Sequence, residues 1–433
     1  MKCSIFLFVC LGVFICSSSV FAEGLTYDLV LKDALSHCHK VIEAELDKEI
    51  KESTVREARY LRYPELSLKI YSEQVNDLSD DTGITTVGGT VFPDSSKFQN
   101  TAYVDLNYNL VDYGIRKKQV AMTRMDLEAS SALVNKTKTD VEKAVLDLYS
   151  NILSLHMERR YRKRILEVMD TLCRIRKRTG DAGLTDKLSV MDRDITKVGM
   201  TGQLAELEFE LASRLSDLSF YTGASYAAES LDVTPYSFEF KGIEDIDFRK
   251  CPEYTYYERQ FRMKNSEIEI EKKKFYPSLD LYLRYSLYGM DDNDYFKSFD
   301  EVREKNFTTG IYTSIPLMEN LKRRHTLSRL RSEKMKAKTV MEEKYSELKT
   351  TFGKLKMNYD FYQKDLENKR DLLRLVKEKS VMVKRLTDAK IIDMEPGLEQ
   401  ESELVKQELE LEKKIIERMT ALKHIMIQTE GAM

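Results

Sequence analysis

Proline is nearly absent from two long stretches of this chain, and this absence constrains the fold more than any other feature. The 433 residues include 7 prolines and 17 glycines, and no proline falls within residues 94–234 or 317–395. Both stretches are rich in Glu, Lys, Arg, Leu and Met, the residues that lose least side-chain freedom in a helix. The sequence therefore predicts two very long helical regions.

The N-terminus has the layout of a secretory signal peptide. Lys2 precedes an apolar run from Ile5 to Cys16, and the small residue Ala22 ends the segment at a suitable cleavage point. A buried N-terminal helix is the alternative. We interpret residues 1–22 as the signal peptide. No later segment has the roughly 18 consecutive apolar residues of a membrane-spanning helix, so we expect none in the mature chain.

Three cysteines remain after the predicted cleavage, namely Cys38, Cys173 and Cys251. Their number is odd and their spacing wide, which argues against a disulfide scaffold or a zinc site, although one pair could still form in an oxidising compartment. His37 and His39 flank Cys38, but adjacent residues on a helix point in different directions and cannot jointly chelate one ion. We expect no metal site here.

Charge and motif content exclude several classes of function. The 69 basic and 72 acidic side chains leave a net charge of -3, whereas a nucleic-acid-binding chain normally carries a basic excess. The five histidines are scattered, and the chain has no GxSxG, HExxH, P-loop or dinucleotide fingerprint. We therefore expect no nucleic-acid partner, no enzyme activity, no catalytic residue and no cofactor.

An internal repeat organises the rest of the chain. In each half a charged helical stretch stops at Tyr-Pro, at Pro64 and again at Pro277, and strict alternation of apolar and polar residues begins. Because proline pushes the preceding residue to an extended conformation, these positions are predicted helix-to-strand junctions. A second alternating segment completes a hairpin in each half. We interpret residues 77–99 and 289–305 as exposed hairpin connections.

Each strand has the length that crosses a bilayer when tilted. Four strands cannot close a barrel, and open edges find no hydrogen-bond partner in hydrocarbon. A membrane location would therefore require several chains to share one barrel.

The expected domain organisation follows from the repeat, with strand-to-helix junctions at Gly114 and Pro316. It comprises the signal peptide (1–22); a first repeat (23–221) with strands at about 64–74 and 101–111, a long helix at about 112–178 and a return helix at about 186–221; an equatorial linker (222–252); a second repeat (253–428) with strands at about 277–288 and 307–316, a long helix at about 318–386 and a return helix at about 398–428; and a tail (429–433).

Apolar residues in the second long helix recur in alternating steps of four and three between Leu348 and Val383. Such a 3.5-residue repeat is typical of left-handed coiled coils. Because a solitary amphipathic rod leaves its apolar seam in water, these helices must pack on others, within the chain or between chains.

Matching acidic turns end the two long helices. Asp181 and Asp186 in the first half correspond to Asp388 and Asp393 in the second, and Glu395 lies close by. One interpretation is helix capping, favoured for Asp186 and Asp393. The other is that the turns converge and place carboxylates around the mouth of a helical tube. The two roles are compatible.

Taken together, these features resemble the TolC-like outer membrane efflux proteins (outer membrane factors) over residues 25–428. The resemblance implies a mainly α fold with membrane β-strands, built from a duplicated helix–hairpin–helix unit. In the family, three chains form a 12-stranded β-barrel continued by a long α-helical coiled-coil tunnel. The features that carry the resemblance are Leu25-Thr26-Tyr27-Asp28 leading to Asp33-Ala34-Leu35, a helix ending at Tyr63-Pro64, the junction Leu110-Val111-Asp112-Tyr113-Gly114-x-Arg116, the Gly-x-x-Gly-Leu-Thr-Asp turn at 180–186, and the duplication itself.

The resemblance also implies where the functional residues lie. Asp393 falls on a family position that constricts the tunnel entrance, whereas a second family aspartate corresponds to Pro396, and Glu319-Asn320 replaces the usual glycine at the second junction. We expect an entrance constriction of Asp393, Asp388, Glu395 and Asp186, with Arg385 and its neighbours Lys384 and Lys390 as candidate ion-pair partners that hold it shut. The turns expected to contact an adaptor or pump contain Gly180, Asp181, Gly183, Leu184, Ala389 and Ile391.

The implied function is that of a passive outer membrane exit duct in a tripartite efflux or secretion system of a Gram-negative bacterium, with a large periplasmic portion. Its expected partners are two further copies in a homotrimer, a periplasmic adaptor (membrane fusion) protein, an inner membrane pump of the RND, ABC or MFS type, and outer membrane lipid. Type I protein secretion is an alternative within this class. A soluble periplasmic coiled-coil scaffold or adaptor is the alternative from another class.

Overall fold

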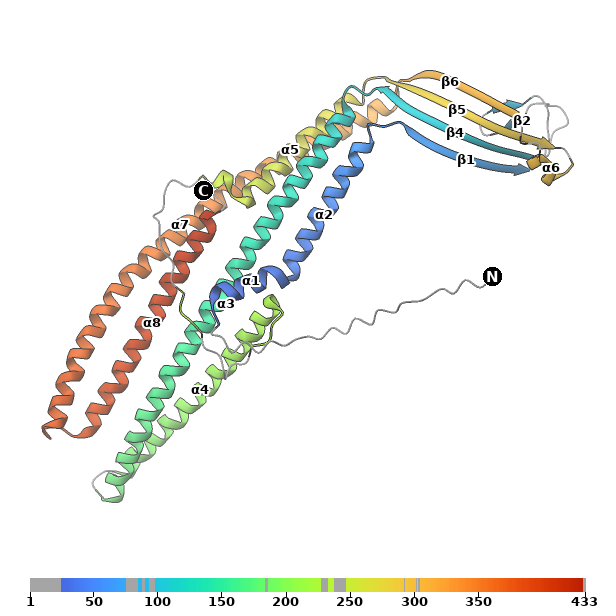
Figure 1. Cartoon of the computed structure of the whole chain (residues 1–433). Coiled ribbons are helices and arrows are strands. Elements are labelled where there is room, and N and C mark those ends of the chain that lie inside the picture. Colours follow the sequence, from blue (N-terminus) through green and yellow to red (C-terminus); the bar gives the residue numbers. More distant parts are fainter. Residues whose placement is uncertain are drawn as a thin grey trace, which may run out of the picture. The chain divides into compact units, whose positions relative to one another are not determined.

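The computed structural model of the chain describes most of the two predicted repeats (Figure 1). The predicted signal peptide and the last three residues lie outside the described residues, as does much of the predicted linker. The described residues are 25–74, 85–87, 90–92, 98–183, 186–226, 233–236, 247–291, 293–300, 302 and 304–430.

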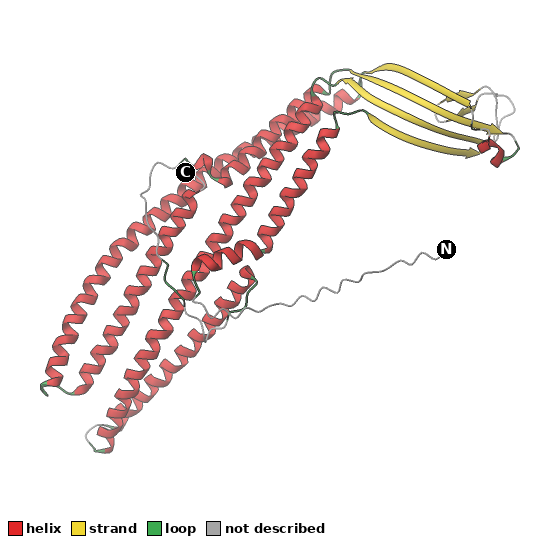
Figure 2. Cartoon of the chain, viewed as in Figure 1, coloured by secondary structure: helices red, strands yellow, loops and turns green. Residues whose placement is uncertain are grey.

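Helices make up most of the described chain (Figure 2). The two longest, α3 with 67 residues and α7 with 70, are each roughly 100 Å long at about 1.5 Å per residue. None of the described helices is both long and apolar enough to cross a membrane. The helices are α1 (Tyr27–His37), α2 (His39–Tyr60), α3 (Ile115–Asp181), α4 (Lys187–Thr222), the 3-10 turn η1 (Phe248–Lys250), α5 (Pro252–Lys273), α6 (Tyr295–Asp300), α7 (Glu319–Asp388) and α8 (Met394–Glu430).

Four long strands form one antiparallel sheet in the order β1-β4-β5-β6, so the hairpins of the two repeats lie side by side. These strands occupy the segments predicted from alternation, with ends a few residues away. The segment 289–305 is more than the plain hairpin connection that the sequence predicts, because it contains the short helix α6. The strands are β1 (Glu65–Gln74), β4 (Phe98–Val111), β5 (Ser278–Asp291) and β6 (Glu304–Ser314), with a separate small sheet of β2 (Thr85–Val87) and β3 (Thr90–Phe92).

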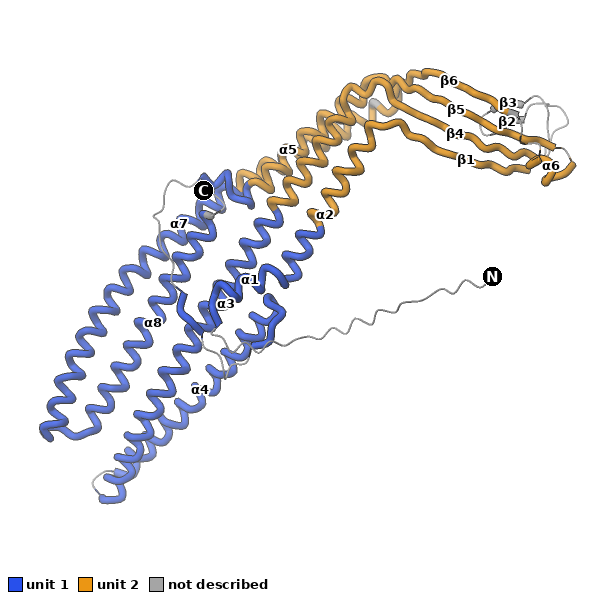
Figure 3. Tube along the Cα trace, in the orientation of Figure 1, with its two compact units in different colours: residues 1–46, 133–254, 344–433 blue, residues 47–132, 255–343 orange. Residues whose placement is uncertain are grey.

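The chain divides into two compact units (Figure 3). Unit 1 contains residues 1–46, 133–254 and 344–433, and unit 2 contains residues 47–132 and 255–343. Each unit therefore takes segments from both sequence repeats. The sheet belongs to unit 2, and the turns that end the long helices belong to unit 1.

The two faces of the four-stranded sheet differ in chemistry and in exposure. Because residues paired across antiparallel strands point to the same side, the strand register defines the faces. Leu68 on one side is 65% exposed, whereas Asp105 on the other is 5% exposed. On a curved sheet, side chains of the convex face diverge and stay exposed, as Leu68 does. Side chains of the concave face converge and bury one another, as Asp105 and its neighbours do. The apolar face consists of Leu66, Leu68, Ile70, Val104, Leu106, Leu283, Phe307 and Ile311, and the polar face includes Lys69, Tyr103, Asp105, Asn107 and Arg284.

An ion pair on the polar face joins the hairpins of the two repeats. Arg284 Nε lies 2.6 Å from Asp105 Oδ1, and its guanidinium lies 4.3 Å from the centre of the Tyr103 ring. Asp105 and Arg284 are direct partners in the register of β4 and β5. A one-residue slip of β4 against β5 would separate Asp105 from Arg284 and leave the buried Asp105 carboxylate without this partner. The ion pair therefore opposes such a slip.

Unit 1 has an aromatic core centred on Tyr149 of α3. The Tyr149 ring is fully buried and lies 5.8 Å from Tyr27 and 5.9 Å from Tyr236, measured between ring centres. Its hydroxyl lies 2.7 Å from the carbonyl oxygens of both Leu25 and Thr234. Burial raises the pKa of Tyr149 to about 12, so the hydroxyl keeps its proton and can donate it. Tyr149 thus fastens two non-helical segments to the helix.

We expect Tyr149→Phe to lower the free energy of unfolding by about 1–2 kcal/mol, because the single hydroxyl proton shared between the Leu25 and Thr234 carbonyls is lost while ring packing is kept. Urea unfolding followed by circular dichroism measures this change. Tyr60→Phe is the matched control, since Tyr60 is 72% exposed. Equal midpoints for the two variants would contradict an anchoring role for the Tyr149 hydroxyl.

Candidate functional site

The candidate site consists of the two helix–turn–helix tips of unit 1, where α3 turns into α4 and α7 turns into α8. Both turns use a residue in the left-handed backbone region. Gly183 has φ 70° in the first tip and Lys390 has φ 58° in the second. These positions are equivalent in the sequence repeat, so duplication has preserved the backbone path although glycine stands at one position and lysine at the other.

Backbone hydrogen bonds close the second tip. Ile391 N donates to Leu386 O at 2.9 Å, and Lys390 N donates to Thr387 O at 2.9 Å. This pair of bonds is a Schellman motif, which satisfies carbonyls at a helix end. It leaves Ala389 and Ile391 exposed at the turn. In the first tip Gly180 lies in the last turn of α3, and Leu184 lies outside the described residues.

Four of the five predicted carboxylates lie exposed at these tips, and the described residues supply no ion pair or side-chain hydrogen bond to them. Asp181, Asp186, Asp388 and Asp393 are all exposed. Asp186 occupies the N-cap position of α4 as the capping interpretation predicts, but its side chain makes no cap hydrogen bond, so the hydrogen-bonding part of that interpretation is wrong for Asp186. Its carboxylate instead points its charge to solvent beside the helix start, where the helix dipole favours an anion.

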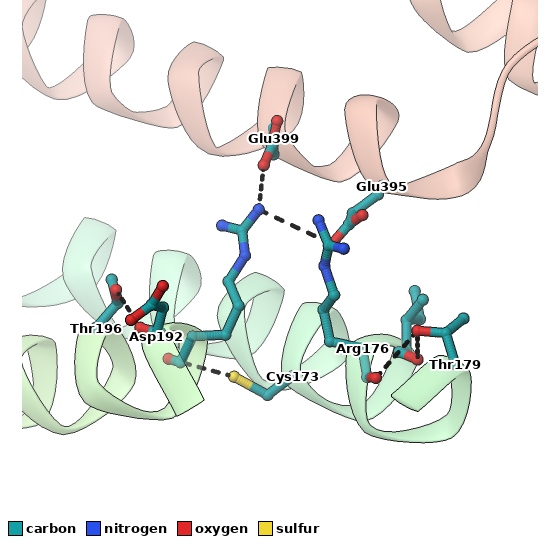
Figure 4. A network of polar contacts seen from close by, with 9 residues as sticks. Cys173, Arg176, Thr179, Asp192, Thr196, Glu395 and Glu399 are labelled. Atoms are coloured by element: carbon teal, nitrogen blue, oxygen red, sulfur yellow. Dashed lines mark hydrogen bonds and ion pairs between the residues drawn. The ribbon is translucent and has the colours of Figure 1, made fainter. Parts of the chain in front are cut away.

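Glu395 behaves differently, because it lies between two arginines from the other tip (Figure 4). Glu395 Oε1 lies 2.6 Å from Arg176 Nε and 3.8 Å from Arg193 Nη2. The first contact is an ion pair by distance without hydrogen-bond alignment. Arg193 also donates to Glu399. The four side chains form a neutral network, half-buried except for the exposed Glu399, that ties α8 to α3 and α4.

The ion-pair partners of Glu395 are Arg176 and Arg193 and not the cations expected from the sequence. Among the ion pairs of the described residues, none joins Asp388 or Asp393 to Lys384, Arg385 or Lys390. The partners Arg176 and Arg193 were missed because they lie in the other repeat, and no local spacing relates them to Glu395. The one feature of the sequence that points to a contact between the repeats is the duplication of the tips, because it implies that the two helix pairs run side by side.

Within each tip the two helices pack at the same pair of repeat-equivalent positions, but the glycine of the pair lies on the first helix in one tip and on the second helix in the other. A Cβ placed on Gly180 would lie 3.0 Å from Val190 Cγ2, and a Cβ placed on Gly397 would lie 3.2 Å from Thr387 Oγ1. Gly180 is the repeat equivalent of Thr387, and Val190 is the repeat equivalent of Gly397. Each tip therefore has one glycine where its two helices approach, on opposite members of the pair.

The predicted junctions lie in unit 2. Pro64 and Pro277 stand immediately before β1 and β5, and Pro316 lies between β6 and α7. Gly114 has φ 76° and precedes α3. These four residues mark the points where sheet and helices meet, as the alternation in the sequence indicated.

Asp112 organises the first strand-to-helix junction. Its carboxylate accepts hydrogen bonds from the backbone N–H groups of Gly114 and Arg116, each at 2.9 Å. Burial by itself would raise the pKa of Asp112, but these bonds and the Arg116 guanidinium lower it overall. The charged carboxylate therefore caps the start of α3.

Other candidate chemistry is sparse in the part of the chain that the structure describes. Cys38, Cys173 and Cys251 are free, and Cys173 Sγ lies 3.7 Å from the carbonyl oxygen of Arg193. No group of three or more His, Cys, Asp or Glu side chains among the described residues is arranged to hold a metal ion.

Comparison with known proteins agrees with this architecture. Residues 30–224 match the family model described as "Outer membrane efflux protein". No curated protein sequence matches the chain.

Solved structures share the fold over nearly the whole chain. A membrane protein from Pseudomonas aeruginosa has a TM-score of 0.76 at 14% identity, covering 93% of both chains. The outer membrane protein VceC of Vibrio cholerae has a TM-score of 0.76 at 13% identity, covering 94% of this chain and 96% of its own. The open state of the MtrE outer membrane channel of Neisseria gonorrhoeae has a TM-score of 0.69 at 14% identity, covering 94% and 89%.

The family match covers residues 30–224, fewer than half of the 433 residues, and the likeness to the solved structures shows a shared fold over nearly the whole chain. The family model covers the first repeat, and the shared fold extends through the second.

The exchanged glycine contact leads to a prediction. Gly180→Thr alone should destabilise the first tip by about 1–3 kcal/mol, because the new side chain meets Val190. The double variant Gly180→Thr/Val190→Gly reproduces the contact of the second tip and should recover much of that loss. Hydrogen exchange of the α3 and α4 ends measures both effects.

The control is Gly199→Thr in α4. A Cβ placed on Gly199 would have nothing within 4 Å, so this change should be nearly neutral. If the destabilisation of the double variant equals the sum of the destabilisations of Gly180→Thr and Val190→Gly measured separately, the two positions are not coupled.

Proposed function

We propose that this protein is the outer membrane exit duct of a tripartite efflux system, through which substrates delivered by an inner membrane pump and a periplasmic adaptor pass without energy input at this component. The observation that carries the proposal is the sheet of unit 2. It combines an exposed apolar face, a polar face and two outer edges, on β1 and β6. Among the described residues no strand pairs with either edge.

Those edges dictate how a membrane-embedded form must be built. Each unpaired backbone group in hydrocarbon costs several kcal/mol, so β1 and β6 need partners from other copies. Neighbouring strands in the sheet are all antiparallel, so β1 and β6 run in opposite directions. The pairing of β6 of one copy with β1 of the next would therefore also be antiparallel. Three copies give 12 strands, the number that the family resemblance implies.

The polar face then lines the duct, and the long helices continue it. Asp105, Arg284 and Lys69 would project toward the lumen, where water solvates them, while the leucines of the apolar face contact lipid. Helices α3, α4, α7 and α8 are proposed to form the tunnel wall, because their tips carry the carboxylates expected at its entrance.

The tips are also the proposed docking region for the adaptor and pump. Gly180, Asp181, Gly183, Ala389 and Ile391 lie at the turns and remain exposed apart from the half-buried Gly180. Leu184 is proposed with them from the sequence alone. The pump class and the cargo are not distinguished by these residues, so type I protein secretion remains the alternative within the proposal.

A soluble periplasmic scaffold is the rival from another class. It accounts for the coiled-coil periodicity and the signal peptide. It does not account for a four-stranded sheet whose apolar side chains, including Leu66, Leu68 and Ile70, are about two-thirds exposed, because water penalises such a surface.

We expect Leu283→Arg to disrupt assembly, since Leu283 lies near the middle of β5 on the apolar face and a charge there costs about 2–4 kcal/mol at the bilayer midplane. Asn107→Arg, almost level with it on the polar face and opposite Glu65, should be tolerated. The yield of detergent-resistant trimer in the outer membrane fraction measures both. The proposed duct would be refuted if the wild-type protein were a folded monomer in detergent, or if it were recovered in the soluble fraction without detergent.

The entrance carboxylates make a separate prediction. In a trimer Asp393 forms a threefold ring of like charge, which attracts cations and repels anions. The purified trimer in a planar bilayer should conduct poorly with cation preference, and Asp393→Asn should reduce that preference. The reversal potential in a salt gradient measures it. Glu52→Gln, a charge loss on α2 away from the tips, is the control. An unchanged reversal potential in Asp393→Asn would return Asp393 to a capping role.

A further inference from the structure

We propose that α6 is an interfacial anchor that lies in the lipid headgroup layer and binds the bilayer surface with its aromatic side chains. This inference rests on the proposed function, because it requires the apolar face of the sheet to contact lipid. It adds a lipid-binding site in a loop between β5 and β6, outside the strands themselves.

Helix α6 lies at the end of the sheet (Figure 1), and polar contacts fasten it there. Asn100 Nδ2 donates to Ser298 Oγ at 2.6 Å, and the hydroxyls of Tyr295 and Ser72 lie 2.7 Å apart. The Tyr295 ring packs edge-on against Phe98 at 5.8 Å between ring centres. The helix therefore reaches from the end of β5 across β4 to the edge strand β1.

The strand register identifies the face that α6 covers. Asn100 pairs with Ser72, and Phe98 pairs with Gln74. Ser72 continues the alternation of Leu68 and Ile70 along β1, so the contacts of α6 all fall on the apolar face. The helix thus lies on the side of the sheet that is proposed to face lipid, at the strand ends farthest from the helical junctions.

The exposure of the α6 side chains separates the helix into two sides. Ser298 is completely buried against the sheet, whereas Phe296 is 77% exposed and Phe299 is 45% exposed. Lys297 is held beside the sheet end by an ion pair with Asp291 at 2.9 Å. Among the described residues both phenyl rings pack edge-on against Tyr295, at 5.6 Å and 5.3 Å between ring centres, and they keep the exposure given above. Two neighbouring exposed phenyl rings form an apolar surface that is costly in water.

The position along the strands matches the headgroup layer. Strand β5 has 14 residues, which at about 3.3 Å each and a tilt of about 45° rise roughly 30 Å, close to the thickness of a hydrocarbon core. Exposed tyrosines lie at the opposite end of the same sheet, at Tyr63, Tyr113 and Tyr276. Aromatic rings at both ends of an apolar band are typical of the two membrane interfaces.

A protein partner is the less suitable occupant. Helix α6 has six residues, and the two exposed rings offer far less area than the roughly 800 Å² per partner of a stable interface. A bilayer surface needs no such area from α6, because the sheet already holds the protein in the membrane and the rings add to that binding.

The chain has no tryptophan, so a single introduced Trp reports its own depth. The test uses Phe296→Trp in full-length protein, reconstituted in phosphatidylcholine vesicles whose acyl chains carry bromine either near the ester groups or near the methyl ends. Leu68→Trp reports the middle of the apolar face, and Asn107→Trp reports the polar face. Phe299→Trp serves as a second reporter if Phe296→Trp does not fold.

We expect the shallow bromines to quench Phe296→Trp several-fold more strongly than the deep ones, the deep bromines to quench Leu68→Trp, and neither to quench Asn107→Trp. Quenching of Leu68→Trp without quenching of Phe296→Trp and Phe299→Trp would overturn the anchor and leave the duct intact. Blue-shifted emission in that case would indicate contact with a neighbouring copy. Absence of quenching in Leu68→Trp would overturn the lipid-facing sheet and with it the proposed function.

Discussion

An antiparallel sheet with two open edges cannot be left in hydrocarbon, and the rest of this molecule is arranged around that constraint. Within one chain the strands leave the edges of β1 and β6 without a described partner. Apolar side chains on one face make the sheet unsuitable for water, and the open edges make a single copy unsuitable for lipid. In the proposed duct the sheet would be stable only as a fraction of a larger closed wall, and assembly would then be part of folding.

The polar groups divide into those with partners inside one chain and those that the proposed assembly would bring together. Asp105 with Arg284, the Tyr149 hydroxyl and the network around Glu395 are all satisfied internally. The aspartates of the two tips are exposed. This contrast is physically reasonable, because buried charges need fixed partners, whereas exposed carboxylates at a shared axis can act through their combined field.

Much of the fold could be predicted because its signals are local. The Tyr-Pro junctions, strict alternation and long proline-free stretches each act within a few residues, and they located the four long strands and the long helices. The partners of Glu395 and the packing of α6 could not be predicted in this way. Arg193 and Glu399 are 206 residues apart, and Ser298 reaches Asn100 across 198 residues. Contacts of that kind depend on how helices and strands meet in space, which spacing along the chain does not encode.

The glycine that changes sides between the two tips has a consequence for exchanging segments between them. Gly180 faces Val190 in one tip and Thr387 faces Gly397 in the other, so equivalent positions carry the glycine on opposite helices. A single exchange in either tip passes through an overfilled or an empty contact. One tip therefore takes on the arrangement of the other without strain only when both positions change together, and a segment transferred between tips would have to carry both helices of the contact.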